Sequence, residues 1–374
     1  TITTSSIELQ KALVEREIPN LSKMLMDYHI IDQPLTAVLR KGKEHYLCRY
    51  RFEDFLKNIR LYPEKYAATI EMLEKMSDFR GGIDLDRYRI SGAIKSRICI
   101  KGTCAGCSRK KECVYNEFAK RMYNLPDLDF QVTNHNMYLM SQKTKTNDHP
   151  PLLRESCFVV VDEAHKFKEA AEDTFGERIS EKDILRYVNS VKILCSPKAN
   201  RDKYKEFLAS LIKESEALFN SLRKKQNSDI EDERGNIISM SAFQSGKLNK
   251  IMYLIDKIEG MKIKRNYGIP VTGDYLKTAI TAINKTSKST IWLDTDENGV
   301  LSLCSTPKDI NNILRTKVWD RNVSHVLASG TISDGTDFEY FKAENGLEYI
   351  KVYHDGRLQI ILGGGYELEE YLEK

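Results

Sequence analysis

The fold class is decided by the stretch Phe158-Val159-Val160-Val161-Asp162-Glu163-Ala164-His165. Its unbroken apolar run is typical of a strand that is buried on both faces of a parallel sheet. Two adjacent carboxylates and an imidazole follow the run, and the carboxyl ends of such strands are where α/β sheets bind their ligands. The stretch therefore predicts an α/β fold with a candidate site at this edge of the sheet.

The candidate catalytic residues of this stretch are Asp162, Glu163 and His165. Mg²⁺ takes oxygen ligands and keeps several waters, so Asp162 could hold it through its hydration shell, beside the phosphates of a nucleotide. Glu163 could then orient and deprotonate an attacking water. The alternative is an acidic helix cap after a core strand, because Asp and Glu are favoured at helix starts.

Strands and helical stretches alternate over the rest of the chain. A strand, a turn and a helix are predicted over residues 2–21, and further strands at residues 130–134, 289–293, 299–303 and 324–329. Helices are predicted at residues 52–76 and 114–123, an almost wholly helical stretch at 177–260 with a polar interruption at 226–236, and a hairpin at 353–357. This order predicts an α/β domain that is interrupted by insertions.

The composition excludes several classes of protein. The 374 residues are 41% hydrophobic and 30% charged, which suits two or three folded domains and excludes a disordered or collagen-like chain. No apolar run approaches the roughly 18 residues of a membrane span, and the N-terminus does not resemble a signal peptide, so we expect a soluble, cytoplasmic protein with no membrane partner. The net charge is only +4, so any nucleic-acid surface must be local.

Half of the eight cysteines are clustered, which suggests a metal site. Cys99, Cys104, Cys107 and Cys113 fall within fifteen residues, and in a reducing compartment such a cluster favours metal ligation over disulfides. Thiolates select zinc or iron–sulfur clusters. The spacing alone favours a local quartet around structural Zn²⁺.

Basic and aromatic residues surround this cysteine cluster. Eight basic residues stand against two acidic ones: Lys95, Arg97, Lys101, Arg109, Lys110, Lys111, Lys120 and Arg121 against Glu112 and Glu117. Lysines and arginines bind phosphate backbones, and an interleaved aromatic such as Tyr115 can stack on the bases of a single strand. Lys110, Lys111 and Tyr115 are therefore candidate DNA contacts, with a solvated basic helix face as the alternative.

Several segments together resemble one protein family. Residues 162–165, Asp-Glu-Ala-His, look like the Walker B motif of superfamily 2 helicases, and other segments resemble the DinG/XPD family of iron–sulfur DNA helicases. Residues 3–10 are similar to that family's motif Ia, 41–48 to the segment with its first cluster cysteine, 132–136 to its strand ending in Asn-His, and 329–331 to its motif III. The matches keep the family's order to about residue 345.

The resemblance implies an activity and a set of site residues. It implies an ATP-dependent 5′ to 3′ DNA helicase that binds Mg²⁺ and ATP at Asp162 and Glu163 and takes single-stranded or forked DNA as its partner. The implied DNA contacts are Thr3, Thr4, Gln10, Asn134 and His135, and the implied residues that couple nucleotide to DNA are Ser329, Gly330 and Thr331. A [4Fe-4S] cluster would be held by Cys48, Cys104, Cys107 and Cys113, with Cys99 as an alternate ligand.

The resemblance also implies a division into domains. An incomplete RecA-like parallel-sheet motor domain would comprise residues 1–40, 126–170 and 286–345. A cysteine-rich metal-cluster domain at 41–125 and a helical arch domain at 171–285 would be inserted into it, and residues 346–374 would form a C-terminal tail without an assigned role.

The sequence departs from the family in one respect. No G-x-x-x-x-G-K-[ST] phosphate loop occurs, and only 43 residues follow Thr331, whereas a second motor domain needs roughly 150. We therefore expect the central portion of a helicase that is inactive as an ATPase alone, with another segment or chain supplying the missing parts. The alternative is a non-catalytic, metal-containing nucleic-acid-binding protein derived from a helicase; a zinc-stabilised scaffold without a nucleic-acid role is a third interpretation.

Overall fold

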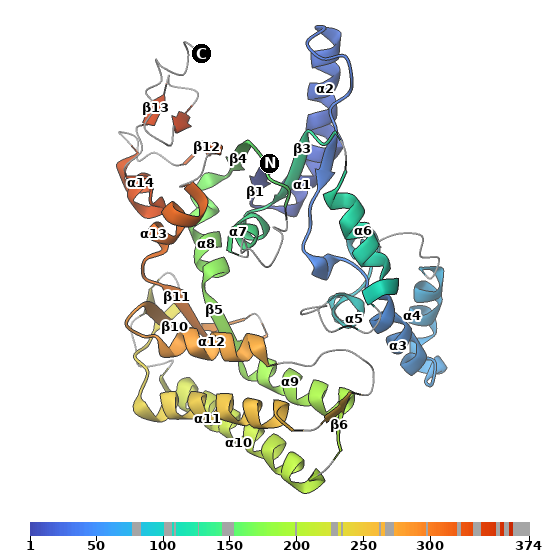
Figure 1. The fold of residues 1–374 in the computed structure, drawn as a ribbon, viewed down its shortest axis with the longest axis vertical. Helices are drawn as coiled ribbons and strands as arrows, with labels where there is room; N and C mark the ends of the chain where they lie inside the picture. The colour runs from blue at the N-terminus through green and yellow to red at the C-terminus, as the bar shows by residue number, and fades with distance from the viewer. Residues whose placement is uncertain are drawn as a thin grey trace. The chain divides into compact units, whose positions relative to one another are not determined.

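The structure is a computed structural model with two compact units (Figure 1). The first unit comprises residues 1–163 and 323–328, and the second comprises 164–322 and 329–374. The described residues are 1–76, 84–100, 107, 110–125, 127–143, 153–198, 200–225, 231–232, 235–261, 263–265, 273–296, 298–319, 323–331, 338–348, 352–354 and 359–361. Among them, no helix combines the length and the apolar character that crossing a membrane requires.

A parallel sheet forms the centre of the first unit. Its strands lie in the order β12 (Ser324–Ala328), β4 (Phe158–Asp162), β1 (Ile2–Thr4), β3 (Phe130–Asn134) and β2 (Ala37–Leu39), and each neighbouring pair is parallel. The apolar run of β4 is buried as expected, with Val159 at 2% and Val161 at 0% exposure. The predicted α/β class with a parallel sheet is confirmed.

Helices next to the strands begin with side-chain caps. The predicted strand, turn and helix at the N-terminus become β1, α1 (Ile7–Ala12), a π-helical turn (Leu13–Glu17) and α2 (Ile18–Asp27). The Ser6 hydroxyl accepts a hydrogen bond from the Leu9 amide at 3.1 Å and so caps α1. Helix α7 (His135–Lys143) follows β3 directly and packs against β3 and β1.

A helical lobe lies between β2 and β3 in the sequence. It consists of α3 (Arg49–Ile59), α4 (Pro63–Lys75), α5 (Gly92–Ile98) and α6 (Val114–Tyr123), with short 3₁₀ turns between them. The prediction for α6 matches its observed bounds, but the single helix predicted over residues 52–76 is two helices. The break precedes Pro63, because the residue before a proline avoids helical angles and proline itself favours the first turn.

The second unit combines long helices with an antiparallel sheet. The helices are α8 (Phe167–Phe175), α9 (Glu181–Leu194), α10 (Arg201–Lys225), α11 (Ala242–Glu259), α12 (Asp274–Asn284), α13 (Ile310–Leu314) and α14 (Glu339–Asn345), with a π-helical turn at Arg315–Trp319. The sheet order is β5 (Glu177–Ser180), β11 (Leu301–Pro307), β10 (Ser289–Thr295), β8 (Gly235–Ile237) and β7 (Glu231–Asp232). One apolar core runs through α9 to α12 and the facing side of this sheet.

This second sheet corrects two predictions. Residues 177–260 were predicted as almost wholly helical apart from an interruption at 226–236, yet the helical part contains β5 and β6 (Cys195–Pro197); β6 pairs with β9 (Ile263–Arg265). Strands β7 and β8 begin within the predicted interruption. Strands β10 and β11 lie where strands were predicted, but they pair antiparallel in the second sheet. The five-residue link between them explains the pairing, because a parallel connection needs a dozen residues or more.

The turn between β10 and β11 is built by two residues. The Asp296 carboxylate accepts hydrogen bonds from the amides of Asn298 and Val300 at 2.9 and 2.8 Å, and Gly299 takes a left-handed φ of 72°. Farther along, β13 (Val352–His354) and β14 (Gln359–Ile361) pair antiparallel, which confirms the hairpin predicted at 353–357.

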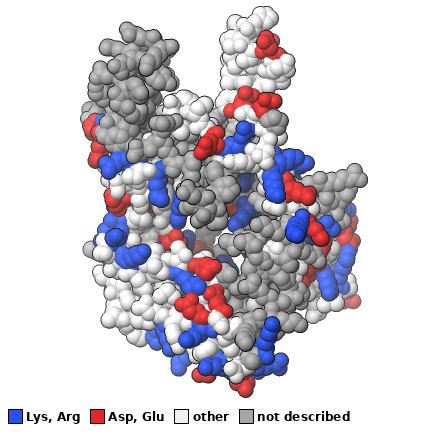
Figure 2. Space-filling model, in the orientation of Figure 1, with Lys and Arg blue, Asp and Glu red and all other residues white. Residues whose placement is uncertain are grey.

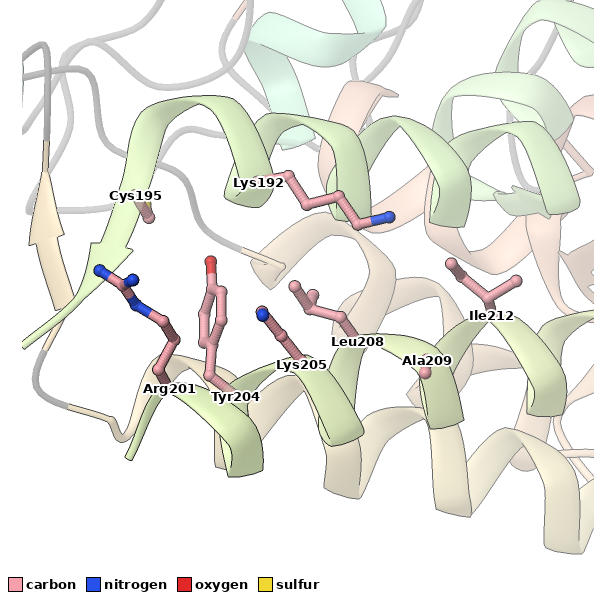
Figure 3. A pocket seen from close by; sticks show the side chains of 8 residues that line it. All are labelled: Lys192, Cys195, Arg201, Tyr204, Lys205, Leu208, Ala209 and Ile212. Atoms are coloured by element: carbon pink, nitrogen blue, oxygen red, sulfur yellow. The ribbon is translucent and has the colours of Figure 1, made fainter. Parts of the chain in front are cut away.

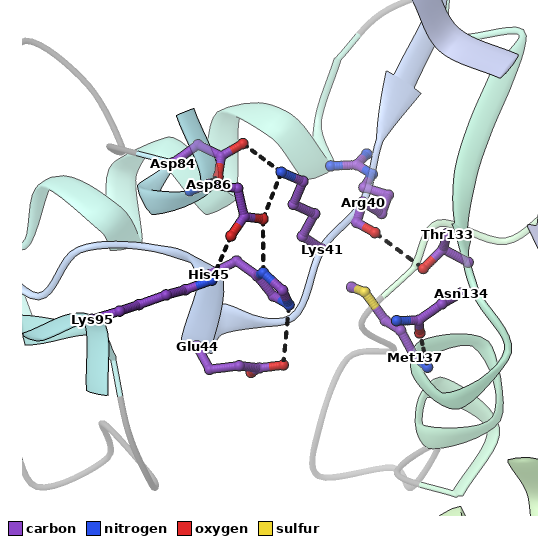
Figure 4. Close-up of polar contacts among 10 residues, drawn as sticks. All are labelled: Arg40, Lys41, Glu44, His45, Asp84, Asp86, Lys95, Thr133, Asn134 and Met137. Carbon is purple, nitrogen blue, oxygen red and sulfur yellow. Dashed lines mark hydrogen bonds and ion pairs between the residues drawn. The ribbon is translucent and has the colours of Figure 1, made fainter. Parts of the chain in front are cut away.

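A network of charged side chains joins the start of the helical lobe to its middle (Figure 4). Lys41 Nζ lies 2.7 Å from Asp84 Oδ2 and 2.9 Å from Asp86 Oδ2, and the Lys41 side chain is only 6% exposed. His45 and Lys95 also bond to the Asp86 carboxylate. Burial raises the pKa of Asp86, but the hydrogen bonds from Lys95 and Lys41 outweigh this effect and hold the pKa far below its ordinary value.

Replacing Asp86 with alanine tests how much this network stabilises the first unit. The change leaves Lys41 and Lys95 without their shared carboxylate. We expect a loss of about 2 kcal/mol in the free energy of unfolding, less than for a fully buried pair because Asp86 keeps some contact with water. The control Glu53→Ala breaks the exposed Arg49–Glu53 pair and should cost under about 0.5 kcal/mol. Denaturant unfolding measures both losses.

The lowered pKa of Asp86 fixes the pH dependence of this effect. Its contribution to stability is complete above the unfolded-state pKa, about 4 for an aspartate, and is lost as the pH falls toward the lower folded-state pKa. The stability of the wild-type protein should therefore decline more steeply below about pH 4 than that of Asp86→Ala. Parallel declines for the two proteins would contradict this account.

Candidate functional site

Polar side chains meet where β1, β3 and β4 end. Thr4 Oγ1 donates a hydrogen bond to Asp162 Oδ2 at 2.9 Å, which joins the carboxyl ends of β1 and β4. One position earlier, Thr3 Oγ1 lies 3.0 Å from His135 Nδ1. The sheet thus brings together side chains that are more than 130 positions apart in the sequence.

Asn134 has a local structural role at this edge. Its Oδ1 accepts a hydrogen bond from the Met137 amide at 2.7 Å, which caps the start of α7 (Figure 4). On the same strand, Thr133 Oγ1 donates to the Arg40 carbonyl at 3.1 Å. Hydrogen bonds therefore fix both the end of β3 and the start of the helix that follows it.

The predicted DNA-contacting residues differ in burial. Thr3 and Thr4 are fully buried, and His135 and Gln10 are each 2% exposed. In this structure the side chains of Thr3, Thr4 and His135 form internal hydrogen bonds at the ends of the strands. Asn134 is half-buried and Lys111 is exposed, and the DNA contacts of all these residues remain predictions.

Glu163 has a strained backbone. Its φ is 53°, in the left-handed region that non-glycine residues adopt at a cost of roughly 1–2 kcal/mol. The strain occurs directly after Asp162, at the turn out of β4. Strained residues of this kind cluster at active sites and ligand clamps, so the turn supports a functional role for the Glu163 carboxylate.

The second unit brings two predicted motifs together. His165 Nδ1 lies 2.8 Å from Ser329 Oγ, and Ser329 Oγ also accepts a hydrogen bond from the Thr331 amide at 3.2 Å. Gly330 and Thr331 are exposed. The candidate catalytic imidazole is therefore in direct contact with the candidate coupling segment.

The helical lobe brings the segment around Cys48 close to two other cysteine segments. The Cys48 amide donates to the Ile98 carbonyl at 2.8 Å, so the backbones on either side of Cys48 and Cys99 run antiparallel. The Tyr46 ring packs against the rings of Tyr115 and Phe118, each 5.3 Å away between centroids. This aromatic contact fixes the start of α6, and hence Cys113, against the segment that carries Cys48.

The described cysteines do not by themselves form a metal site. Cys48 and Cys113 are half-buried and stand at the N-termini of α3 and α6, Cys107 is half-buried, and Cys99 is 4% exposed. Among the described side chains, no three His, Cys, Asp or Glu residues lie close enough to hold a metal ion. Cys104 and the side chain of Lys110 lie outside the described part, so the ligand set remains a prediction.

The structure shows one surface that the sequence reasoning missed, an aromatic-basic stripe along α11. Phe243 and Tyr253 are 54% and 47% exposed. Lys247 lies 5.1 Å from the Phe243 ring centroid, and Lys250 and Lys257 lie 4.8 and 5.1 Å from that of Tyr253. Spacings of three and four residues put these side chains on one helix face, and that periodicity could have revealed the stripe.

Charge does not gather into one large field on the face shown in Figure 2. Described basic and acidic side chains alternate there, in both units. Tyr115 is half-buried, with its ring in the aromatic contact with Tyr46, so its capacity to stack on a base is limited to the part of the ring that faces solvent. On this face, a nucleic-acid surface would have to be built from small local groups of basic residues.

Comparison of Glu163→Gly with Glu163→Ala isolates the backbone strain. Both changes remove the carboxylate, but only glycine adopts a φ of 53° without a steric penalty from Cβ. We expect the glycine variant to be more stable than the alanine variant by about 1 kcal/mol in the free energy of unfolding. In the control pair at the exposed helical position Lys213, alanine should be the more stable by about 1 kcal/mol. If alanine were the more stable residue at both positions, the backbone at Glu163 would not be strained.

Comparisons with known proteins agree with the motifs. No protein-family model matches the chain. The chain is 22% identical to 3′-5′ exonuclease DinG of Bacillus subtilis over 92% of its own length and 42% of that protein. It is 26% identical to ATP-dependent DNA helicase YoaA of Escherichia coli over 51% of its own length and 30% of that protein.

One further curated relative and one solved structure also match the chain. Probable ATP-dependent helicase YpvA of Bacillus subtilis is 20% identical over 91% of the chain and 54% of that protein. The solved structure of S. tokodaii Xpd4 is 21% identical, with a TM-score of 0.33, over 59% of this chain and 46% of that one. The chain thus spans about half or less of the curated relatives that it matches. The matched relatives agree with the resemblance of the ordered motifs to the DinG/XPD family of helicases.

Proposed function

We propose that the chain is part of an ATP-dependent DNA helicase that moves 5′ to 3′ on single-stranded or forked DNA in the cytoplasm. The observation that carries this proposal is the edge of the parallel sheet, where Thr4 bonds to Asp162 and the strained Glu163 follows. The two adjacent carboxylates suit a hydrated divalent cation, which prefers oxygen ligands. The names of the matched relatives support the same activity.

The residues at this edge have separate tasks in ATP hydrolysis. Mg²⁺ bound with ATP neutralises phosphate charge. Asp162 is oriented by the Thr4 hydroxyl and would hold the water shell of the cation. Glu163, turned by its left-handed backbone, would orient the attacking water and accept its proton.

His165 would connect this chemistry to the coupling segment. Its ring nitrogen is hydrogen-bonded to Ser329, whose hydroxyl also holds the Thr331 amide. A change in the position of His165 would therefore move the backbone of residues 329–331 through two hydrogen bonds. We assign His165 as a positioning residue, and Ser329, Gly330 and Thr331 as the segment that it controls.

We propose two DNA-contacting surfaces, one in each unit. The first comprises Lys110, Lys111 and the exposed part of Tyr115 at the start of α6, and the second is the aromatic-basic stripe on α11. Cations bind the phosphates of a single strand, and exposed aromatic rings stack on its bases. In the stripe, Lys250 and Lys257 have no acidic ion-pair partner among the described residues.

We further propose a [4Fe-4S] cluster held by Cys48, Cys104, Cys107 and Cys113. Cys48 and Cys113 suit thiolate ligands, because both stand at helix N-termini, where the backbone favours negative charge. Cys99 is buried and adjacent in the backbone pairing, so it stays the alternate ligand. Zn²⁺ is the alternative metal. The cluster would tie α3 and α6 to the loop between them.

The variant Glu163→Gln tests the proposed function in the complete gene product that contains these 374 residues. The amide keeps the shape of the side chain but cannot accept a proton, so DNA-stimulated ATP hydrolysis should fall by about 10²- to 10⁴-fold. ATP binding should persist through Asp162. Glu169→Gln, the same chemical change on the exposed surface of α8, should leave turnover unchanged. Equal turnover in wild-type and Glu163→Gln protein would reject the catalytic role.

Anaerobic purification tests the proposed cluster. We expect a brown protein with about four iron and four sulfide per chain, as the [4Fe-4S] composition requires. Cys113→Ser should lose iron, whereas Cys157→Ser, at an exposed cysteine away from the lobe, should keep it. The iron content of Cys48→Ser is compared with that of Cys99→Ser, and the variant that loses iron identifies the cysteine that binds the cluster. One zinc per chain without visible absorption would reject the cluster.

A further inference from the structure

The second unit contains a cavity that is open to solvent. It has a volume of about 600 Å³ and lies between α9 and α10 (Figure 3), and this volume is typical of small-molecule sites. Eight residues line it: Lys192, Cys195, Arg201, Tyr204, Lys205, Leu208, Ala209 and Ile212. All of them come from α9, α10 and the first residue of β6, so the cavity is built within one continuous stretch of chain.

Among the described lining residues of the cavity, the charged ones are all basic. Arg201 and Lys205 are one turn apart on α10, and Lys192 extends along the cavity from α9 (Figure 3). The described part of the chain contributes no carboxylate to the lining and no ion-pair partner to these three cations. Three uncompensated cations around one hollow favour a ligand that carries more than one negative charge.

The remaining lining is apolar and rigid. Leu208, Ala209 and Ile212 continue along the same side of α10 from the basic residues. Tyr204 is only 5% exposed, and its hydroxyl donates to the Val191 carbonyl at 3.1 Å, which fixes the ring between the two helices. A ligand that fills this cavity therefore needs an apolar or aromatic body next to its charged group.

We propose that this cavity binds a nucleoside monophosphate, either free or as the phosphorylated end of a nucleic-acid strand. A phosphate monoester carries close to two negative charges and three acceptor oxygens, which matches Arg201, Lys205 and Lys192. The base and sugar supply the body that the wall of Leu208, Ala209 and Ile212 requires. The cavity does not include Asp162 or Glu163. Binding of a ligand there is therefore independent of the proposed ATP hydrolysis.

Calorimetric titration of the full chain with AMP, adenosine and inorganic phosphate tests the ligand class. AMP should bind at least about tenfold more tightly than either of the others, because each of them lacks half of the recognised features. Adenosine binding as tightly as AMP, or phosphate binding as tightly as AMP, would overturn the proposal. So would the absence of AMP binding.

Three variants place the binding in the cavity. Arg201→Glu with Lys205→Glu reverses the charge, and Ala209→Phe fills the hollow without changing charge; each should weaken AMP binding at least about tenfold. Lys213→Glu, on α10 but outside the lining, should have no effect. Unchanged binding in Ala209→Phe, or equal loss in Lys213→Glu, would overturn the proposal. Circular dichroism checks that each variant is folded.

Oligonucleotides distinguish the two sources of the ligand. An oligothymidylate with a 5′-phosphate is compared with the same strand ending in a 5′-hydroxyl, in wild-type and charge-reversed protein. Tighter binding of the phosphorylated strand that depends on Arg201 and Lys205 identifies a strand end as the source. If the two strands bind equally while AMP binding still depends on these residues, the source is the free nucleotide.

Discussion

The pairing of the three-residue strand β1 with both β3 and β4 is the constraint on which the first unit depends. Ile2 aligns with Val132 on one side and with Val160 on the other, so three distant segments share one register. The N-terminal amino group extends this pairing with a hydrogen bond to the Phe158 carbonyl at 2.8 Å. Because side chains alternate between the two faces of a sheet, a shift of β1 by one residue would turn Thr3 and Thr4 to the opposite faces.

This register determines what the threonines can do. In the observed register, Thr4 meets Asp162 and Thr3 meets His135, and both hydroxyls become internal hydrogen-bonding groups. A buried carboxylate or imidazole without such a partner would lose its hydration without compensation. The threonines of the motif therefore link the alignment of the sheet to the orientation of the groups at its edge.

Most of the elements that the sequence predicted correctly have a local signal. The apolar run of β4, the amphipathic period of α6 and the carboxylates after β4 each depend on adjacent or nearly adjacent residues, and each is found where it was expected. The antiparallel pairing of β10 and β11 was missed although the signal was local as well: Asp296 and Gly299 form a tight turn that excludes a crossover. The alternation of residues within the two strands does not show how they pair, whereas the short link between them does.

Long-range contacts could not be predicted in the same way. The burial of Gln10 and His135 follows from their tertiary neighbours, so a motif that resembles a DNA-contacting segment gives no information on which side chains face solvent. The network of Lys41 with Asp84 and Asp86 joins residues more than forty positions apart, and nothing in their local sequence distinguishes them from surface charges. The left-handed backbone at Glu163 could not be predicted from the residue type either, because glutamate is not favoured in that conformation.

Pairing, more than the count of charges, decides which basic residues can bind an anion. The excess of basic residues around the cysteines includes Lys95, which is bonded to Asp86, and Arg97, whose guanidinium lies 5.6 Å from the Phe55 ring centroid. In the second unit, Lys277 is surrounded by Asp256, Glu259 and Asp274, and hydrogen bonding to Glu259 raises the pKa of Lys277.

Cations that are paired with a carboxylate, such as Lys95 and Lys277, contribute little to an external field, since their charge is compensated at contact distance. The cations around the α9–α10 cavity differ because the described residues provide no carboxylate to oppose them. A chain with a net charge of only +4 can therefore still present strongly basic sites, provided that its acidic residues are engaged elsewhere.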